Sequence, residues 1–195
     1  MQPAASCQEM LLQRLFTFSF PCPVQMSQNA TMISLIEVIA KQKEAIRVRS
    51  RQVFSLVRPE HMGWQPEREA LRVGEMLRHL WTSEEGTRRV ALEGNFAYYE
   101  KRIPEGLRAI MGSPEELTRE LEHLERVHNE TIAAIRAFPQ ERLEDDRVHA
   151  GLCYRRKIYA ILMGITDHEV HHRAQLMTYL RILGTPVPEV VRRSD

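Results

Sequence analysis

Apolar residues recur at every third or fourth position in four long stretches of the chain that contain no proline. These stretches are residues 24–58, 67–103, 115–138 and 140–185. Such spacing is typical of an amphipathic α-helix, which buries one apolar stripe along its length. We find no alternating run of Val, Ile or Thr beside an Asn-Gly type of turn, so the sequence predicts no hairpin. The pattern therefore predicts an all-α protein.

The first two stretches each predict one helix. The first helix is expected to start after Ser27 or Asn29, either of which can cap it, and to run to about Val57, before Pro59. Its inward candidates are Leu35, Ile39, Ile46 and Val53. The second helix fits residues 70–90. Its stripe contains Val73, Met76, Leu77, Leu80 and Trp81.

The third and fourth stretches carry clearer end signals. Ser113 as cap, Pro114 in the first turn and Glu116 three residues after the cap predict the start of the third helix. Its stripe is Leu117, Leu121, Leu124, His128, Thr131 and Ile135. The fourth helix is expected over residues 155–183, with Gly184 ending it. Its stripe is Ile158, Ile161, Ile165, His168, His172, Leu176, Tyr179 and Leu183.

Four amphipathic helices predict a four-helix bundle, because each apolar stripe must be covered by another. A length of 195 residues suits one domain, which we place at residues 29–195. We interpret residues 1–28 as an N-terminal appendage, either poorly ordered or produced by a start upstream of Met26.

The charge balance argues against nucleic acid as a partner. Lys and Arg number 27 against 26 Asp and Glu, which leaves a formal charge of +1 and no overall field for a polyanion. The basic runs at residues 47–51 and 155–157 are short, lack interleaved aromatic residues and are typical of solvated helix faces. No apolar run approaches the roughly 18 residues of a membrane span.

The three cysteines support neither a disulfide framework nor a thiolate zinc site. Cys7, Cys22 and Cys153 form no CxxC pair. The apolar stretch at residues 11–20 contains Gln13 and Arg14 and has no basic residue before it, which makes it a poor secretory signal. We therefore expect a cytoplasmic protein.

Candidate chemistry concentrates in the segment 167–175, which reads DHEVHHRAQ. On a helix, His168 and His172 lie about 40° apart and one turn from each other, so both rings can reach one point. They also occupy stripe positions where a bundle normally places aliphatic side chains. Because burying a pair of imidazoles without a polar partner costs free energy, the pattern indicates a shared metal ion. The competing interpretation is a chance pair of packing histidines. His171 can replace a ligand or support one.

A third histidine, His79, lies in the segment EMLRHL at residues 75–80. It flanks the apolar stripe of its helix, about 100° from Leu80, and by spacing alone it is more typical of a boundary position. Together with HEVHHRAQLMTYLR at residues 168–181, however, this segment resembles the DinB/YfiT-like family of metal-dependent four-helix-bundle proteins. The resemblance covers about residues 30–190, including the helix exit into Pro59 and the FPQERL turn at residues 138–143.

The resemblance implies up-down-down-up topology, a homodimer, and one divalent metal held by His79, His168 and His172. Known activities in the family include thiol-dependent transferases and isomerases that use low-molecular-weight thiols. We therefore expect a thiol-linked transferase or a hydrolase acting on a small molecule. The sequence departs from the family pattern at Ala174, where glycine is frequent, and we expect little consequence because alanine is also small and favours helix.

The metal and the neighbouring roles stay open. Imidazole suits zinc, nickel, iron and copper alike, with zinc or nickel expected first and iron also considered. No catalytic residue can be assigned by spacing. Glu75 either orients a ligand or is solvated, Gln175 either lines a pocket or bonds between helices, and Arg173 is expected to pair with a surface carboxylate.

Two other classes compete with this hypothesis. A di-iron carboxylate bundle needs inward Glu-x-x-His pairs, and the chain offers Glu120/His123, Glu125/His128 and Glu169/His172, although Glu125 and Glu169 are poorly aimed. A non-enzymatic dimeric bundle with a structural or vestigial metal predicts a closed site, whereas an enzyme predicts a pocket beside the metal. The remaining histidines, His61, His123 and His149, are expected in loops or on the surface.

Overall fold

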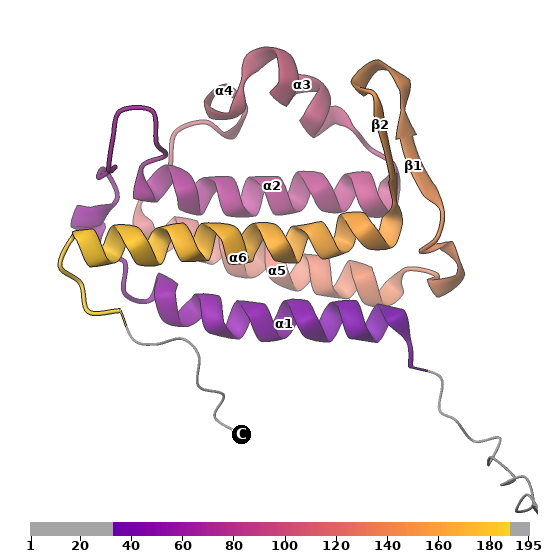
Figure 1. Ribbon diagram of the computed structural model, residues 1–195, viewed down its shortest axis with the longest axis horizontal. Helices are drawn as coiled ribbons and strands as arrows, with labels where there is room; N and C mark the ends of the chain where they lie inside the picture. Colours follow the sequence, from indigo (N-terminus) through magenta and orange to yellow (C-terminus); the bar gives the residue numbers. More distant parts are fainter. Residues whose placement is uncertain (1–32, 188–195) are drawn as a thin grey trace, which may run out of the picture. The chain divides into compact units, whose positions relative to one another are not determined.

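A computed structural model describes residues 33–187 and is built around four long helices (Figure 1). They are α1 (Leu35–Phe54), α2 (Val73–Glu93), α5 (Leu117–Ala137) and α6 (Ile158–Ile182). Two shorter helices, α3 (Ala97–Glu105) and α4 (Leu107–Met111), lie between α2 and α5, and strands β1 (Asp146–His149) and β2 (Tyr154–Lys157) precede α6. Single 3-10 turns occur at Pro59–His61, Gln140–Arg142 and Ala150–Leu152. The predicted appendage at 1–28 lies outside the described residues.

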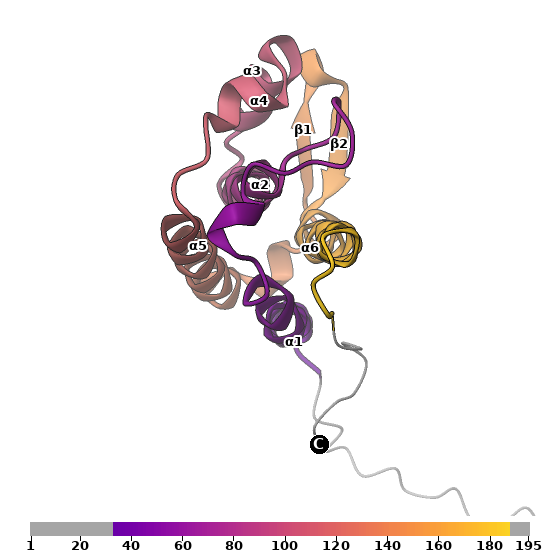
Figure 2. The same ribbon diagram turned by 90° about the vertical axis from the view of Figure 1, so that its left-hand side faces the viewer.

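The four long helices form a bundle in which α1 and α2 are diagonal partners, each packed against both α5 and α6 (Figure 2). Side-chain pairs fix the directions. Arg78 and Arg88 of α2 meet Glu120 and Glu130 of α5 in the same order, so these two helices run parallel. Helices α1 and α6 also run parallel, while the two pairs oppose each other (Figure 1). The predicted bundle and its up-down-down-up topology are confirmed. No helix in residues 33–187 is long and apolar enough to cross a membrane.

The bundle has two apolar clusters, one at each end, separated by buried polar residues. One cluster joins the starts of α1 and α6 to the ends of α2 and α5, and the other joins the opposite ends. We call the polar residues between them the middle layer. Its buried members are Lys43, Arg47, Ser50, His79, Ser83, Glu84, His128, Thr131, Thr166, Glu169 and His172. A polar layer inside a bundle needs internal partners, because burial removes water from these groups.

Four charged side chains of the middle layer supply those partners to one another. Lys43 Nζ lies 2.9 Å from Glu84 Oε2 and 3.3 Å from Glu169 Oε2. Arg47 Nη2 donates to the same two oxygens at 3.1 Å and 3.0 Å, and its Nη1 donates to the Leu124 carbonyl at 2.9 Å. Burial opposes ionisation of Glu169, but Arg47 and Lys43 together lower its pKa to about 2. This ion quartet joins α1, α2 and α6. It also corrects the expectation for the run 47–51, because Arg47 is buried rather than solvated.

The predicted helix starts were less accurate than the helices themselves. Helix α1 begins at Leu35, capped by Ser34, whose Oγ accepts from Glu37 N at 3.4 Å; the predicted caps Ser27 and Asn29 lie outside the described residues. Helix α5 begins at Leu117, with Glu116 as its cap, so the capping box predicted from Ser113 is wrong. Buried Glu120 of the first turn of α5 instead accepts from Glu115 N at 2.7 Å, which organises this end of the helix.

The prediction that the chain has no hairpin is wrong. Strands β1 and β2 pair antiparallel, with Asp146 opposite Lys157 and His149 opposite Tyr154. Residues 155–157, expected in the last helix, are therefore extended as part of β2, and α6 starts at Ile158. The turn passes through Cys153 in the left-handed region, with φ of 49°, and not through an Asn-Gly pair. The end of α6 agrees with the prediction, because Gly184 adopts φ of 76° just beyond it.

Candidate metal centre

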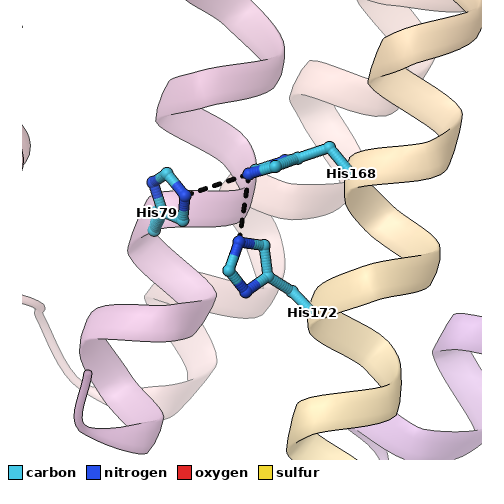
Figure 3. Close-up of side chains that lie close together, drawn as sticks. All are labelled: His79, His168 and His172. Carbon is cyan, nitrogen blue, oxygen red and sulfur yellow. Dashed lines mark hydrogen bonds between the residues drawn. The ribbon is translucent and has the colours of Figure 1, made fainter. Parts of the chain in front are cut away.

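Three histidines from two helices point their Nε2 atoms at one another in the middle layer (Figure 3). His168 Nε2 lies 3.0 Å from His79 Nε2 and 3.0 Å from His172 Nε2. His168 and His172 are one turn apart on α6, as predicted, and His79 faces them from α2. His79 and His172 are buried and His168 is half-buried. The resemblance had grouped these residues, and the structure brings all three together.

The outer nitrogens of two rings have polar partners that fix their orientation. His79 Nδ1 lies 2.9 Å from Ser83 Oγ, which in turn lies 2.9 Å from the hydroxyl of Tyr98. His172 Nδ1 lies 2.6 Å from Gln175 Oε1. A carbonyl oxygen accepts, so the His172 proton resides on Nδ1, and the chain through Ser83 allows the same tautomer for His79. Both Nε2 atoms then direct lone pairs toward the centre of the cluster.

All three imidazoles are held in the neutral form. Burial is the main cause that lowers the pKa of His79 to about 3. Burial likewise lowers the pKa of His168 and that of His172 to about 4 each. The positive charge of Arg102, on α3, adds to all three pKa shifts in the same direction. At neutral pH the rings are therefore uncharged, which is the form that binds a metal.

The donor set suits a divalent transition metal. Nitrogens that share one ion at about 2.0–2.1 Å lie roughly 3 Å or slightly more from each other. The two separations from His168 Nε2 are close to this, and all three ligand atoms lie within 4.8 Å of one another. Converging lone pairs repel one another unless a cation or a proton lies between them, so a bound cation would relieve this repulsion. Among residues 33–187, these three form the one group of His, Cys, Asp and Glu side chains arranged to hold an ion.

The carboxylates of the di-iron alternative are engaged elsewhere. Glu120 binds Arg78 at 2.7 Å, and Glu125 binds Arg51 at 2.6 Å on the surface. Glu169 belongs to the ion quartet. None of the three forms part of a metal-holding group in the described chain, so the geometry does not support a carboxylate-bridged pair of ions.

Other residues considered from sequence take different places. Glu75 accepts from Arg72 N at 2.8 Å and pairs with Arg108, so it caps α2 and does not orient a ligand. Gln175 bonds His172 on its own helix rather than another helix. Arg173 donates to the Ile46 carbonyl at 3.3 Å and pairs with no described carboxylate, which corrects that expectation.

The histidines outside the cluster also differ in part from expectation. His171 is exposed, with its ring 4.8 Å from that of His172. His61 lies in a turn as expected but is buried, where its ring accepts from Arg58 N at 3.2 Å. His123 is half-buried against Trp81, and His149 pairs with Glu100 at 2.9 Å.

A cavity of about 280 Å³ opens beside the histidine cluster. Its walls come from α2, α3, β2 and α6, and they include Ser83, His168, Tyr99, Tyr154, Arg102 and Arg156. The hydroxyl of Tyr99 lies 2.9 Å from Thr87 Oγ1, which ties α3 to α2 at this wall. Apart from His168, sequence reasoning missed these wall residues. Ser83 was detectable, one turn after His79, but the residues of α3 and β2 were not, because those elements carry no pattern linked to the histidines.

Fold and site together define a class of helical-bundle proteins in which histidines of two helices converge beside a small cavity. Within this class, the chain belongs to the DinB superfamily, whose family model matches residues 42–176. It is similar to YjoA, an uncharacterized protein of Bacillus subtilis, with 24% identity over 138 residues that cover 69% of this chain and 82% of YjoA.

Solved structures share the fold. The crystal structure of YjoA matches with a TM-score of 0.63 at 20% identity, covering 80% of this chain and 99% of YjoA. A DinB-like protein of Bacillus cereus matches with a TM-score of 0.59 at 15% identity, covering 80% and 94%. YfiT of Bacillus subtilis, described as a probable metal-dependent hydrolase with an unusual four-helix bundle topology, matches with a TM-score of 0.60 at 12% identity, covering 86% and 95%.

Proposed function

We propose that this protein is a metal-dependent enzyme that holds one divalent transition metal through His79, His168 and His172 and acts on a small molecule in the adjoining cavity. The observation that carries the proposal is the convergence of three neutral imidazoles, one of which, that of His168, lines the cavity. A purely structural metal needs no such opening. The description of YfiT as a probable metal-dependent hydrolase gives the proposal further support.

The protein's own residues position the ligands and shape the reaction space. Ser83, held by Tyr98, orients the His79 ring, and Gln175 orients the His172 ring. Such outer partners fix the tautomer of a ligand and typically change metal affinity by 10- to 100-fold. An ion bound there supplies Lewis-acid chemistry, which makes a water or a thiol a better nucleophile near neutral pH. We therefore propose hydrolysis or thiol-linked transfer as the reaction.

Elemental analysis of tag-free protein tests the metal site. We expect about one transition-metal ion per chain in the wild type, with zinc or nickel first, and loss of the ion in His79→Ala and His168→Ala. The matched control is His171→Ala, because His171 is exposed and adjacent to His172 in sequence but outside the cluster. If this control retains the ion, the loss of metal in the other two variants is due to the missing ligand and not to the removal of any histidine from this region.

Three results would overturn the proposal. Two irons per chain would favour the carboxylate alternative. No metal, even after incubation with zinc or nickel, would make the three histidines packing residues. If one ion is bound but admits no exchangeable small ligand, the metal is structural and the enzyme proposal is wrong. Cobalt(II) substitution provides that measurement, because its visible absorption responds to a change of ligand.

A further inference from the structure

Two arginines line the cavity and have no ion-pair partner in the described part of the chain. Arg102 of α3 is half-buried, Arg156 of β2 is exposed, and both line the cavity beside His168. Neither guanidinium forms an ion pair with any carboxylate in residues 33–187. The neighbouring Arg155, by contrast, pairs with Asp146 at 3.4 Å and does not line the cavity. The cavity thus has two cationic groups available to a ligand.

The charge on the cavity wall is not balanced by the protein. Glu84 is the one acidic residue among the lining residues, and its carboxylate is shared by Lys43 and Arg47 within the ion quartet. That quartet of two cations and two anions is neutral as a unit. Arg102 and Arg156 therefore leave an excess positive charge around the space beside the three histidines, before any metal adds its own. Such a field concentrates anions.

The remaining walls set the size of the ligand. Ile161, Gly164 and Ile165 of α6 form an apolar side, and Tyr99 and Tyr154 add aromatic surface. A volume of about 280 Å³ is at the small end for ligand cavities. The cavity therefore fits a short molecule whose apolar middle joins two polar ends.

We propose that the substrate is a small molecule with a carboxylate or phosphate group, which Arg102 and Arg156 bind while the reactive end of the substrate lies at the histidine cluster. This inference rests on the proposed function and adds the substrate class to it. Guanidinium groups form strong charge-assisted hydrogen bonds with both anions. The arginines come from α3 and β2, outside the four-helix bundle, so the elements that select the substrate are separate from those that hold the ion.

The test uses cobalt(II)-substituted full-length protein and three hydroxamic acids as probes. Butyrohydroxamate ends in a methyl group, succinate monohydroxamate ends in a carboxylate, and 3-phosphonopropionohydroxamate ends in a phosphonate, while the metal-binding group is the same. We expect at least one anionic probe to bind about tenfold more tightly than butyrohydroxamate, as measured from the cobalt absorption. The preferred anion then distinguishes a carboxylate from a phosphate substrate.

Variants assign the preference to its residues. In Arg102→Gln/Arg156→Gln we expect the preference to fall to about twofold or less, with butyrohydroxamate binding unchanged. Arg155→Gln is the matched control and should keep the full preference. Equal binding of all three probes by the wild type, or a preference that survives the double substitution, would overturn this inference alone. Failure of cobalt to bind at His79 and His168 would instead contradict the proposed function.

Discussion

Gly164 provides a test of the cavity that leaves the proposed ligands untouched. It is the seventh residue of α6, one turn before His168, and it lines the cavity. A Cβ built on Gly164 meets no atom within 4 Å. Because glycine in a helix interior costs about 1 kcal/mol relative to alanine, Gly164→Ala should stabilise the protein by about that amount. No clash opposes the gain.

The measurement is thermal or urea unfolding of the metal-free protein. For a chain of this size, 1 kcal/mol corresponds to an increase in Tm of about 2–4 °C. Gly86 of α2 is the matched control, because a Cβ there would lie within 3.0 Å of three atoms of the Tyr98 side chain. Overpacking costs about 1–3 kcal/mol, and displacement of Tyr98 also breaks its bond to Ser83, so Gly86→Ala should destabilise.

A larger side chain at the same position tests function. Gly164→Leu should retain the metal but weaken binding of hydroxamate probes at least tenfold, because the side chain fills the cavity wall next to His168. If Gly164→Ala lowers Tm, the position is not open as described. If Gly164→Leu binds the probes as the wild type does, the cavity is not where ligands reach the metal.

The remaining predictions concern orientation and pH. Ser83→Ala should lower metal affinity about 10- to 100-fold in a chelator competition, and it should also lower the Tm of the metal-free protein, because it removes the partner of Tyr98. An equal affinity would show that Ser83 does not orient His79. Burial, together with Arg47 and Lys43, lowers the pKa of His128 to about 3, so this residue contributes stability above its unfolded pKa of 6.5 that is lost as pH falls toward 3. The free energy of unfolding, measured with urea between pH 7 and 5, should therefore fall less steeply with decreasing pH in His128→Gln than in the wild type. The two slopes should differ by up to about 1.4 kcal/mol per pH unit, and equal slopes would contradict this prediction.

The fold was predictable to the extent that periodicity records burial. Four long helices each carry an apolar stripe, so their number and order followed from the sequence. The hairpin did not, because its four-residue strands place mostly polar side chains on a partly exposed ribbon and lack apolar alternation. The start of α5 depends on Glu120, whose carboxylate is buried by contact with Arg78 and Trp81 of another helix. Contacts of this kind leave no local signal.

The residues of the candidate site likewise divide into those that the sequence pattern predicts and those that it does not. His168 and His172 were found from their spacing, because one turn of one helix suffices to bring them together. His79 seemed marginal by spacing, since a single stripe is too narrow to include it. In the structure α2 packs against both α5 and α6, and its buried surface is correspondingly broad, extending without interruption from Met76 to Leu80. The resemblance, rather than periodicity, therefore supplied the third histidine.

The ion quartet determines how far the helices that hold the site can slide past one another. Lys43 and Arg47 of α1 each form ion pairs with both Glu84 of α2 and Glu169 of α6. Moving α2 or α6 along its axis by one turn, about 5.4 Å, would leave a buried carboxylate without its cationic partners. Breaking a buried ion pair in this way costs about 3–5 kcal/mol. Apolar layers tolerate such slippage far better. Helix α1 contributes no histidine to the cluster, yet it sets the axial register of the two helices on which the distance from His79 to His168 depends.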